Sequence, residues 1–139
     1  MLHKDDILNN ISIGDKFEVN LAITEELVKQ FGVLSGDMNP LHTDDDYAIK
    51  KGFLGKVCYG NILGLLISRM VGMNIGSSEV MLISEKIDFK HPVYVGDIIE
   101  LRGDVSRTSE AVRIIELELS FWNSLKIKVA SGKCQMRCF

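Results

Sequence analysis

The sequence contains few of the residues that mark disulfide-rich or metal-dependent proteins. Its 139 residues include three cysteines, two prolines and three histidines. Cys58, Cys134 and Cys138 form no Cys-x-x-Cys pair, so we expect reduced thiols in the core or on strands, with no redox or metal role. A chain of this length can bury enough apolar surface to fold without such links.

The chain also lacks an excess of positive charge and a long apolar run. Its formal net charge of -3 gives no basic surface for nucleic acid, although it does not exclude a small anionic ligand that needs only local basic residues. The longest apolar run, residues 62–71, contains Ser68 and Arg69 and is too short to cross a bilayer. Residues 1–10 are polar and hold no signal-peptide core, so we expect a cytoplasmic protein and no membrane partner.

The remaining pattern is that of one α+β domain spanning residues 1–139. Helical spacing predicts a helix from the N-cap Thr24 to Ser35, a short helix from Thr43 to Lys51, and a helix from Asn61 to Gly72. The last helix is apolar on almost every face, so it should be buried on most sides. Alternation predicts strands at about residues 17–22, 80–83, 86–90, 98–107, 111–122 and 125–138.

The most informative stretch is residues 35–42, which read Ser-Gly-Asp-Met-Asn-Pro-Leu-His. On an intact helix Asp37 and His42 would lie roughly 140° apart, and Pro40 does not fit inside a helix. We therefore expect an irregular loop that folds Asp37 and His42 back toward one point. Taken alone, these residues are explained equally well by a turn with a helix cap and by a catalytic site.

The whole string, together with Ala48 and Phe53, resembles the signature of the MaoC-like dehydratases, the family of R-specific enoyl-CoA hydratases. Residues 89–97, which read Phe-x-x-Pro-Val-x-x-Gly-Asp, are similar to the same family. The resemblance implies a hot-dog fold, in which an antiparallel sheet wraps around a long central helix. It also implies a homodimer or higher homo-oligomer, because a single unit leaves sheet edges open.

The reaction that this resemblance implies is syn addition of water to a 2-enoyl thioester, or the reverse dehydration of an R-3-hydroxyacyl thioester. Asp37 and His42 would be the catalytic pair that holds one water, and the backbone N–H of Gly60 would bind the oxyanion. Ser35 and Asn39 would support the loop by bonding its backbone. No metal or cofactor is implied, and coenzyme A or acyl carrier protein would carry the acyl group.

One departure concerns residues 59–61, which read Tyr-Gly-Asn where members of that family usually carry His-Gly-Met. This change would alter the wall and polarity of the pocket, and it leaves the acyl group and its carrier open. Candidate pocket side chains are Leu41, Phe53, Leu63 and Phe89. Two other functions fit the residues: a hot-dog thioesterase, which would release free thiol, and a non-catalytic acyl-thioester-binding protein.

Two further groups are given structural roles. The acids at residues 44–46 are expected to form the first turn of a helix rather than a metal site, because His42 is the only histidine near them. His91 stands beside Pro92 in a turn, and we expect it to be a plain surface residue.

Overall fold

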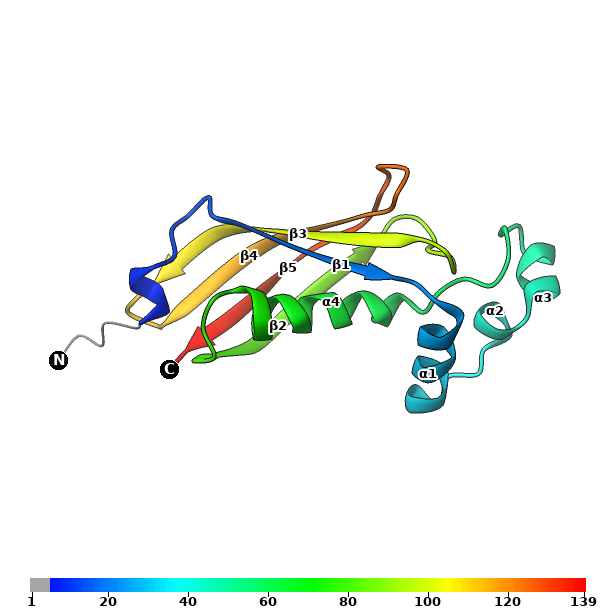
Figure 1. The fold of residues 1–139 in the computed structure, drawn as a ribbon, viewed down its shortest axis with the longest axis horizontal. Coiled ribbons are helices and arrows are strands. Elements are labelled where there is room, and N and C mark those ends of the chain that lie inside the picture. Colours follow the sequence, from blue (N-terminus) through cyan, green and yellow to red (C-terminus); the bar gives the residue numbers. More distant parts are fainter. Residues whose placement is uncertain (1–5) are drawn as a thin grey trace.

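The computed structural model describes residues 6–139, and Figure 1 shows a single antiparallel sheet with a helical segment against one face. The strands are β1 (Lys16–Ala22), β2 (Val80–Phe89), β3 (Ile98–Ser109), β4 (Ile114–Trp122) and β5 (Lys128–Cys138). Their order is β1-β3-β4-β5-β2, so β1 and β2 form the edges. The first five residues of the polar N-terminal segment lie outside the described range.

The helices are α1 (Glu25–Ser35), α2 (Pro40–Thr43), α3 (Asp45–Lys50) and α4 (Leu63–Arg69), with 3₁₀ turns at Ile7–Asn9 and Gly60–Ile62 and a π turn at Met70–Asn74. We call residues 60–74 the central helix. It lies along the sheet, whereas α1, α2 and α3 lie together beyond the end of the sheet that is far from the chain termini (Figure 1). Among residues 6–139, no helix is long and apolar enough to cross a membrane.

The core lies between the sheet and the central helix. Alternate residues of β4 point into it, as the strand period of two requires, and Leu117 and Phe121 are fully buried. Leu66 and Met70 of the central helix belong to the same apolar cluster. Full burial of one such side chain contributes about 1.5–3 kcal/mol, so this layer supplies most of the stability of the fold.

The expected α+β arrangement is confirmed, with changes at the strand ends. The two strands predicted at residues 80–83 and 86–90 are one strand, β2, whose pairing with β5 shifts register between Leu82 and Ser84. β4 and β5 each begin three residues later than predicted, at Ile114 and Lys128, because the preceding turns hold Arg113 and Lys126 at positive φ. The turns before β4 and β5 therefore extend further along the chain than the alternation indicated.

The expectation that the central helix is buried on most sides was wrong for one face. Ile62, Leu66 and Ile67 are enclosed, but Leu65 is 43% exposed and Met73 is 80% exposed. The physical reason is that one sheet covers only one side of a helix. The opposite side of the central helix stays uncovered in the single chain.

Candidate active site

The segment that carries Asp37 starts where α1 ends. α1 begins at Thr24, whose side-chain oxygen accepts the Leu27 N–H at 3.1 Å. It ends at Gly36, which has a φ of 74° and donates its N–H to the Gly32 carbonyl oxygen. Because glycine adopts this left-handed conformation without strain, the helix stops at the predicted place and the chain turns away from it.

A series of side-chain-to-backbone hydrogen bonds shapes the loop after α1. The Ser35 hydroxyl oxygen accepts the Asp37 N–H at 3.1 Å, and an Asp37 carboxylate oxygen accepts the Asn39 N–H at 3.0 Å. The Asn39 amide oxygen in turn accepts the Leu41 N–H at 2.9 Å. Ser35 and Asn39 thus bond the backbone of their own loop, which is the geometry expected of supporting residues.

Residues 40–43 differ from the irregular loop that we expected, because they form the one-turn helix α2. Asn39 is its N-cap and Pro40 occupies its first position. A proline fits there, since the N–H it lacks has no partner within a helix and its fixed φ is already helical. His42 therefore projects from a helical turn, while Asp37 stays on the loop before it.

The ring of His42 is held from two directions. Its Nδ1 lies 2.6 Å from the Val57 carbonyl oxygen. Because a carbonyl oxygen only accepts, Nδ1 carries the hydrogen, and Nε2 is the nitrogen left for a bound molecule. The ring also packs on the ring of Tyr59, with centroids 4.2 Å apart. These contacts fix both the tautomer and the orientation of His42.

Gly60 opens the central helix as the first residue of its 3₁₀ turn. Within the part of the chain that the structure describes, the Gly60 N–H has no protein acceptor, as expected for the first N–H groups of a helix. A Cβ at this position would lie 2.8 Å from the ring of Phe89. Gly60 therefore has an available N–H, and any residue with a side chain there would require the ring of Phe89 to shift.

Asp37, His42 and Gly60 line the same cavity, which has a volume of about 460 Å³. The cavity lies where the α1–α3 segment meets the start of the central helix and the end of β2. Its other lining residues are Phe31, Phe53, Val57, Cys58, Tyr59, Asn61, Leu63, Phe89, Lys90, His91, Pro92 and Val93. Three of the four candidate pocket side chains are thus present and Leu41 is not, and both Tyr59 and Asn61 form part of the wall.

The expectation that His91 is a plain surface residue was incomplete. His91 is exposed, but it lines the cavity together with its neighbour Lys90. The N–H groups of Lys90 and His91 both donate to the Val129 carbonyl oxygen, at 2.8 and 3.1 Å. The position of Lys90 and His91 at the cavity depends on the pairing of β2 with β5, which the local sequence does not reveal. The available signal was that both residues directly follow Phe89, a candidate pocket residue.

Burial controls the ionisation of Cys58 and Tyr59, which are adjacent on the cavity wall. It raises the pKa of the Cys58 thiol to about 12, and the negative charge of Asp97 adds to the effect. It also raises the pKa of Tyr59, with a further contribution from the charge of Asp37. Both groups are therefore neutral near pH 7, and Cys58 is not a thiolate nucleophile.

Two structural interpretations of the sequence are confirmed. Cys58, Cys134 and Cys138 are free and buried. Asp44 is the N-cap of α3, where its carboxylate accepts the Tyr47 N–H at 3.1 Å, and the two acids that follow stand in the first turn. The acidic run therefore complements the positive end of a helix.

The cavity presents three groups that can act on one bound molecule. The lining includes a carboxylate, Asp37, and an imidazole, His42, which are the group types that hold a water molecule and move its protons in acid–base catalysis. The N–H of Gly60 is a donor of the kind that stabilises an oxyanion. Phe31, Phe53 and the other apolar lining residues suit a hydrocarbon chain, and the volume lies within the range of small-molecule sites.

A family model described as the MaoC like domain matches residues 9–120. The chain belongs to this family. The matched range contains Asp37, His42 and Gly60, and with them the whole α1–α3 segment and the central helix.

Relatives within the MaoC-like family are similar in sequence at a low level. The (R)-specific enoyl-CoA hydratase of Aeromonas caviae is 28% identical over 101 residues, which are 73% of this chain and 75% of that protein. The mitochondrial 3-hydroxyacyl-[acyl-carrier-protein] dehydratase of Arabidopsis thaliana is 28% identical over 89 residues, 64% of this chain and 52% of that protein. The match thus spans about half the length of the plant relative.

The fold agrees with that of a solved member. The structure of the (R)-hydratase from A. caviae involved in PHA biosynthesis aligns with a TM-score of 0.86 and 24% identity, covering 93% of this chain and 98% of that one. The predicted hot-dog fold is therefore confirmed.

Proposed function

We propose that this chain is an R-specific 2-enoyl thioester hydratase, which acts as a 3-hydroxyacyl thioester dehydratase in the reverse direction. The observation that carries the proposal is the single cavity lined by Asp37, His42 and Gly60. Membership of the MaoC-like family, and relatives named as hydratase and dehydratase, support the same reaction class.

In the proposed hydration, one water molecule lies between the Asp37 carboxylate and Nε2 of His42. As the water oxygen bonds to the β-carbon, the pair takes one of its protons, and the electrons of the carbon–carbon double bond move toward the thioester carbonyl. The pair then returns a proton to the α-carbon on the same face, so H and OH add syn. Positioned acid and base groups contribute about 10²–10⁴-fold to such rates.

The N–H of Gly60 is proposed to bind the thioester oxygen, where negative charge develops during the reaction. It lies at the N-terminal end of the central helix, where unpaired donors and the helix dipole both favour an anion. Losing one such donor typically lowers the rate about 10²–10³-fold. These steps use only groups of this chain, so the proposed mechanism requires no metal or cofactor.

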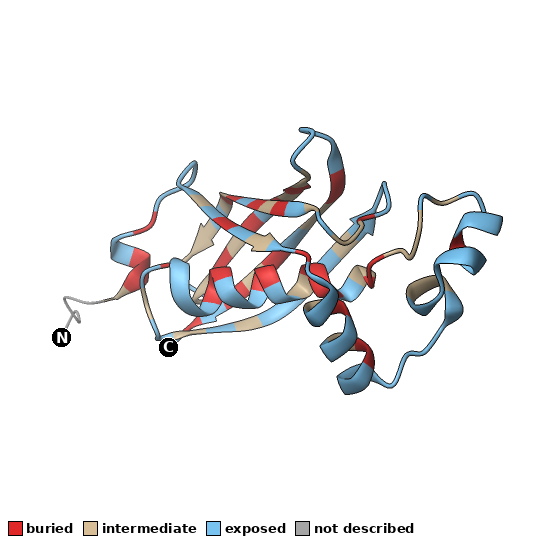
Figure 2. Cartoon of the chain, turned by 45° about the vertical axis from the view of Figure 1, so that its right-hand side comes forward, coloured by how far each residue is buried: buried red, intermediate tan, exposed pale blue. Residues whose placement is uncertain are grey.

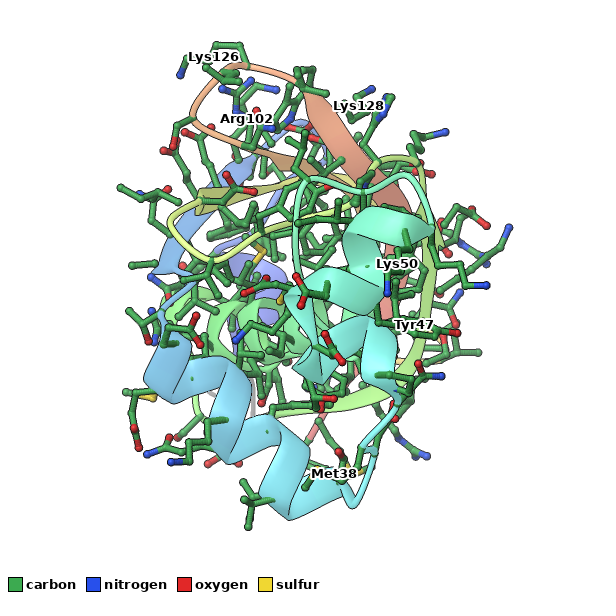
Figure 3. The ribbon with its side chains drawn as sticks, turned by 90° about the vertical axis from the view of Figure 1, so that its right-hand side faces the viewer. Met38, Tyr47, Lys50, Arg102, Lys126 and Lys128 are labelled. Carbon is green, nitrogen blue, oxygen red and sulfur yellow. The ribbon has the colours of Figure 1, made fainter. Side chains whose placement is uncertain are left out.

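The proposed substrate carrier is coenzyme A or acyl carrier protein, both of which present the acyl group on a phosphate-containing arm. Lys90 and His91 line the cavity and are exposed. Lys128 precedes Val129, whose carbonyl accepts the N–H groups of both residues. Figure 3, which looks onto the end of the molecule that carries α1–α3, shows Lys126 and Lys128 on one side of it. Lys90 is therefore a suitable partner for the phosphates, whereas Lys128 lies over the ring of Trp122 and lines a separate hollow.

We also propose a homodimer that pairs along β2. This strand is bonded to β5 on one side and leaves its other edge open. Met81 and Ile83 on β2, and Leu65 on the uncovered face of the central helix, are exposed apolar residues that a second copy would bury. Light scattering coupled to size-exclusion chromatography tests this proposal, and a mass of 15.6 kDa, that of one chain, would contradict it.

The activity is tested with a set of short, medium and branched 2-enoyl-CoAs. The expected result is loss of the enoyl thioester absorbance and formation of the R-3-hydroxyacyl product, identified by chiral chromatography. A thiol-trapping dye is added in parallel reactions. Thiol release without hydration would identify a thioesterase instead, and binding without either reaction would identify a non-catalytic acyl-thioester-binding protein.

A further inference from the structure

The side chain of Tyr59 reaches from the start of the central helix into the α1–α3 segment. Its ring is only 4% exposed, and its hydroxyl donates a hydrogen bond of 2.5 Å to the backbone carbonyl oxygen of Asp37. Within residues 6–139, the other hydrogen bonds of residues 36–40 all stay inside residues 32–44. The Tyr59 hydroxyl is thus the long-range hydrogen bond of the loop that carries Asp37.

The ring of Tyr59 also sits between two elements of that segment. It packs against His42 of α2, with centroids 4.2 Å apart and an interplanar angle of 31°. It also meets Phe31 of α1, with ring centroids 4.9 Å apart. Gly32 makes room for the hydroxyl, because a Cβ there would lie 2.8 Å from the Tyr59 oxygen. One buried ring therefore contacts both elements that flank the loop.

The backbone of Tyr59 is connected to the third group of the site. The Tyr59 carbonyl oxygen accepts the Ile62 N–H at 3.1 Å. Since a peptide bond is planar, fixing this carbonyl also fixes the direction of the Gly60 N–H, which belongs to the same peptide unit. Side chain and backbone together connect Asp37, His42 and Gly60 through one residue.

We propose that Tyr59 is the positioning residue that holds Asp37 and His42 at fixed positions relative to the Gly60 N–H. The proposal rests on the proposed hydratase function, because the groups it aligns are those of that reaction. The Tyr59 hydroxyl does not act on the substrate itself, since its hydrogen is donated to the Asp37 carbonyl oxygen. Tyr59 acts through the geometry of the other three residues.

The test compares Tyr59→Phe, which removes only the hydroxyl, with Tyr59→Leu, which also removes the ring beside His42. The matched control is Tyr94→Phe, because the Tyr94 hydroxyl likewise bonds a loop backbone, accepting the Leu54 N–H at 3.3 Å, but does not line the cavity. Two readouts are taken for each protein: kcat and KM for a good enoyl-CoA, and amide hydrogen exchange of residues 36–41, which needs no activity.

The expected result for Tyr59→Phe is a kcat lowered about 10- to 100-fold, since displacements near 1 Å cost this much in positioned reactions. KM should change less than about threefold, and exchange in residues 36–41 should become faster. Tyr59→Leu should lower kcat further, whereas Tyr94→Phe should match the wild type in kcat and in the exchange of residues 36–41.

Wild-type kcat per folded molecule in Tyr59→Phe would overturn the proposal, and so would wild-type exchange in residues 36–41. If the wild-type chain hydrates no enoyl thioester, the proposed function fails separately. In that case faster exchange in Tyr59→Phe alone would still show that Tyr59 holds the loop, and unchanged exchange would show that it does not.

Discussion

The sheet layer and the α1–α3 segment are stabilised in different ways. In the sheet layer, side chains such as Leu117 and Phe121 are fully buried against the central helix. In α1, α2 and α3 together, only Val28, Gly32 and Ala48 are buried. Figure 2 shows this contrast, with buried positions concentrated in the sheet and α4 and exposed positions prevailing in α1–α3.

Because of this difference, most of the stability comes from the sheet layer, whereas two of the three candidate catalytic groups lie in the less buried segment. Asp37 and His42 lie on the segment that buries little, whereas Gly60 lies on the helix that completes the core. Regions with few buried contacts open at lower free energy than the global unfolding of the protein. Substitutions in the α1–α3 segment should therefore affect activity more than stability, and substitutions in the sheet layer should do the reverse.

The largest expected effect is the loss of turnover when Asp37 is replaced. Asp37→Asn keeps an oxygen that can accept the Asn39 N–H but removes the carboxylate charge, so kcat should fall about 10²–10⁴-fold. His42→Ala should fall in the same range. Thermal unfolding should stay close to that of the wild type in both variants, as measured by circular dichroism.

The control is Asp44→Asn, because Asp44 also accepts a backbone N–H through its carboxylate, at the N-cap of α3. It should retain wild-type kcat. Full hydration activity in Asp37→Asn would refute the assigned roles, and equal losses in Asp37→Asn and Asp44→Asn would mean that the carboxylate-to-backbone hydrogen bond, not acid–base chemistry, is what matters.

The second prediction concerns the sheet layer. Phe121→Ala leaves a cavity at a fully buried position, so the free energy of unfolding should fall by about 3–5 kcal/mol. At a temperature where the variant remains folded, kcat should be near the wild-type value. Urea titration measures the stability, and a loss of kcat without a loss of stability would break the proposed separation.

The third prediction tests the point where the two regions meet. Gly60→Ala would place a Cβ against the ring of Phe89, which is 55% exposed and can move into the cavity mouth. We expect kcat/KM to fall about 10- to 100-fold, because the thioester is displaced from the N–H. Gly72→Ala is the control, since a Cβ there meets nothing within 4 Å.

The cause of this loss is separated by a double-variant comparison. When Phe89→Ala is already present, the added effect of Gly60→Ala should become smaller, because the ring that it displaces is gone. An equally large effect in both backgrounds would exclude Phe89 as the cause.

The effect that should be smallest near pH 7 is the pH dependence of stability, which grows only above about pH 9. Burial raises the pKa of Cys58 and of Cys134 from 9.0 to about 12. Between these values the unfolded thiols have lost their protons and the folded ones keep them, so stability should fall as pH rises, by about 1.4 kcal/mol per pH unit for each thiol. Urea titrations from pH 8 to 10.5 measure this slope.

Cys134→Ala isolates the contribution of one thiol, since it should make the slope less steep whatever it does to stability at pH 8. An unchanged slope would contradict the burial argument. A thiol reagent should modify Cys58 before Cys134, because Cys58 lines the cavity whereas Cys134 is fully buried on β5 and becomes accessible only when the sheet unfolds.

The parts of the fold that the sequence predicted well depend on neighbours a few residues away. Thr24 and Gly36 mark the two ends of α1, because caps form within one turn, whereas α3 begins two residues after the predicted start at Thr43, with Asp44 as its N-cap. The helical turn at Pro40 was missed because proline is read as a helix breaker unless its place at the first position is recognised. The role of Ser35 in the loop was predictable for the same local reason.

Strand alternation and the two ends of α1 follow from chemistry within short stretches, so local patterns predicted them, whereas Asp37, His42 and Gly60 were marked by the resemblance to the MaoC-like family. The tertiary structure alone decided that the Tyr59 hydroxyl meets Asp37, that Lys90 and His91 line the cavity, and that Leu65 stays exposed. These contacts join segments far apart in the chain, so they depend on strand order and on how the central helix passes the α1–α3 segment, which no local pattern encodes.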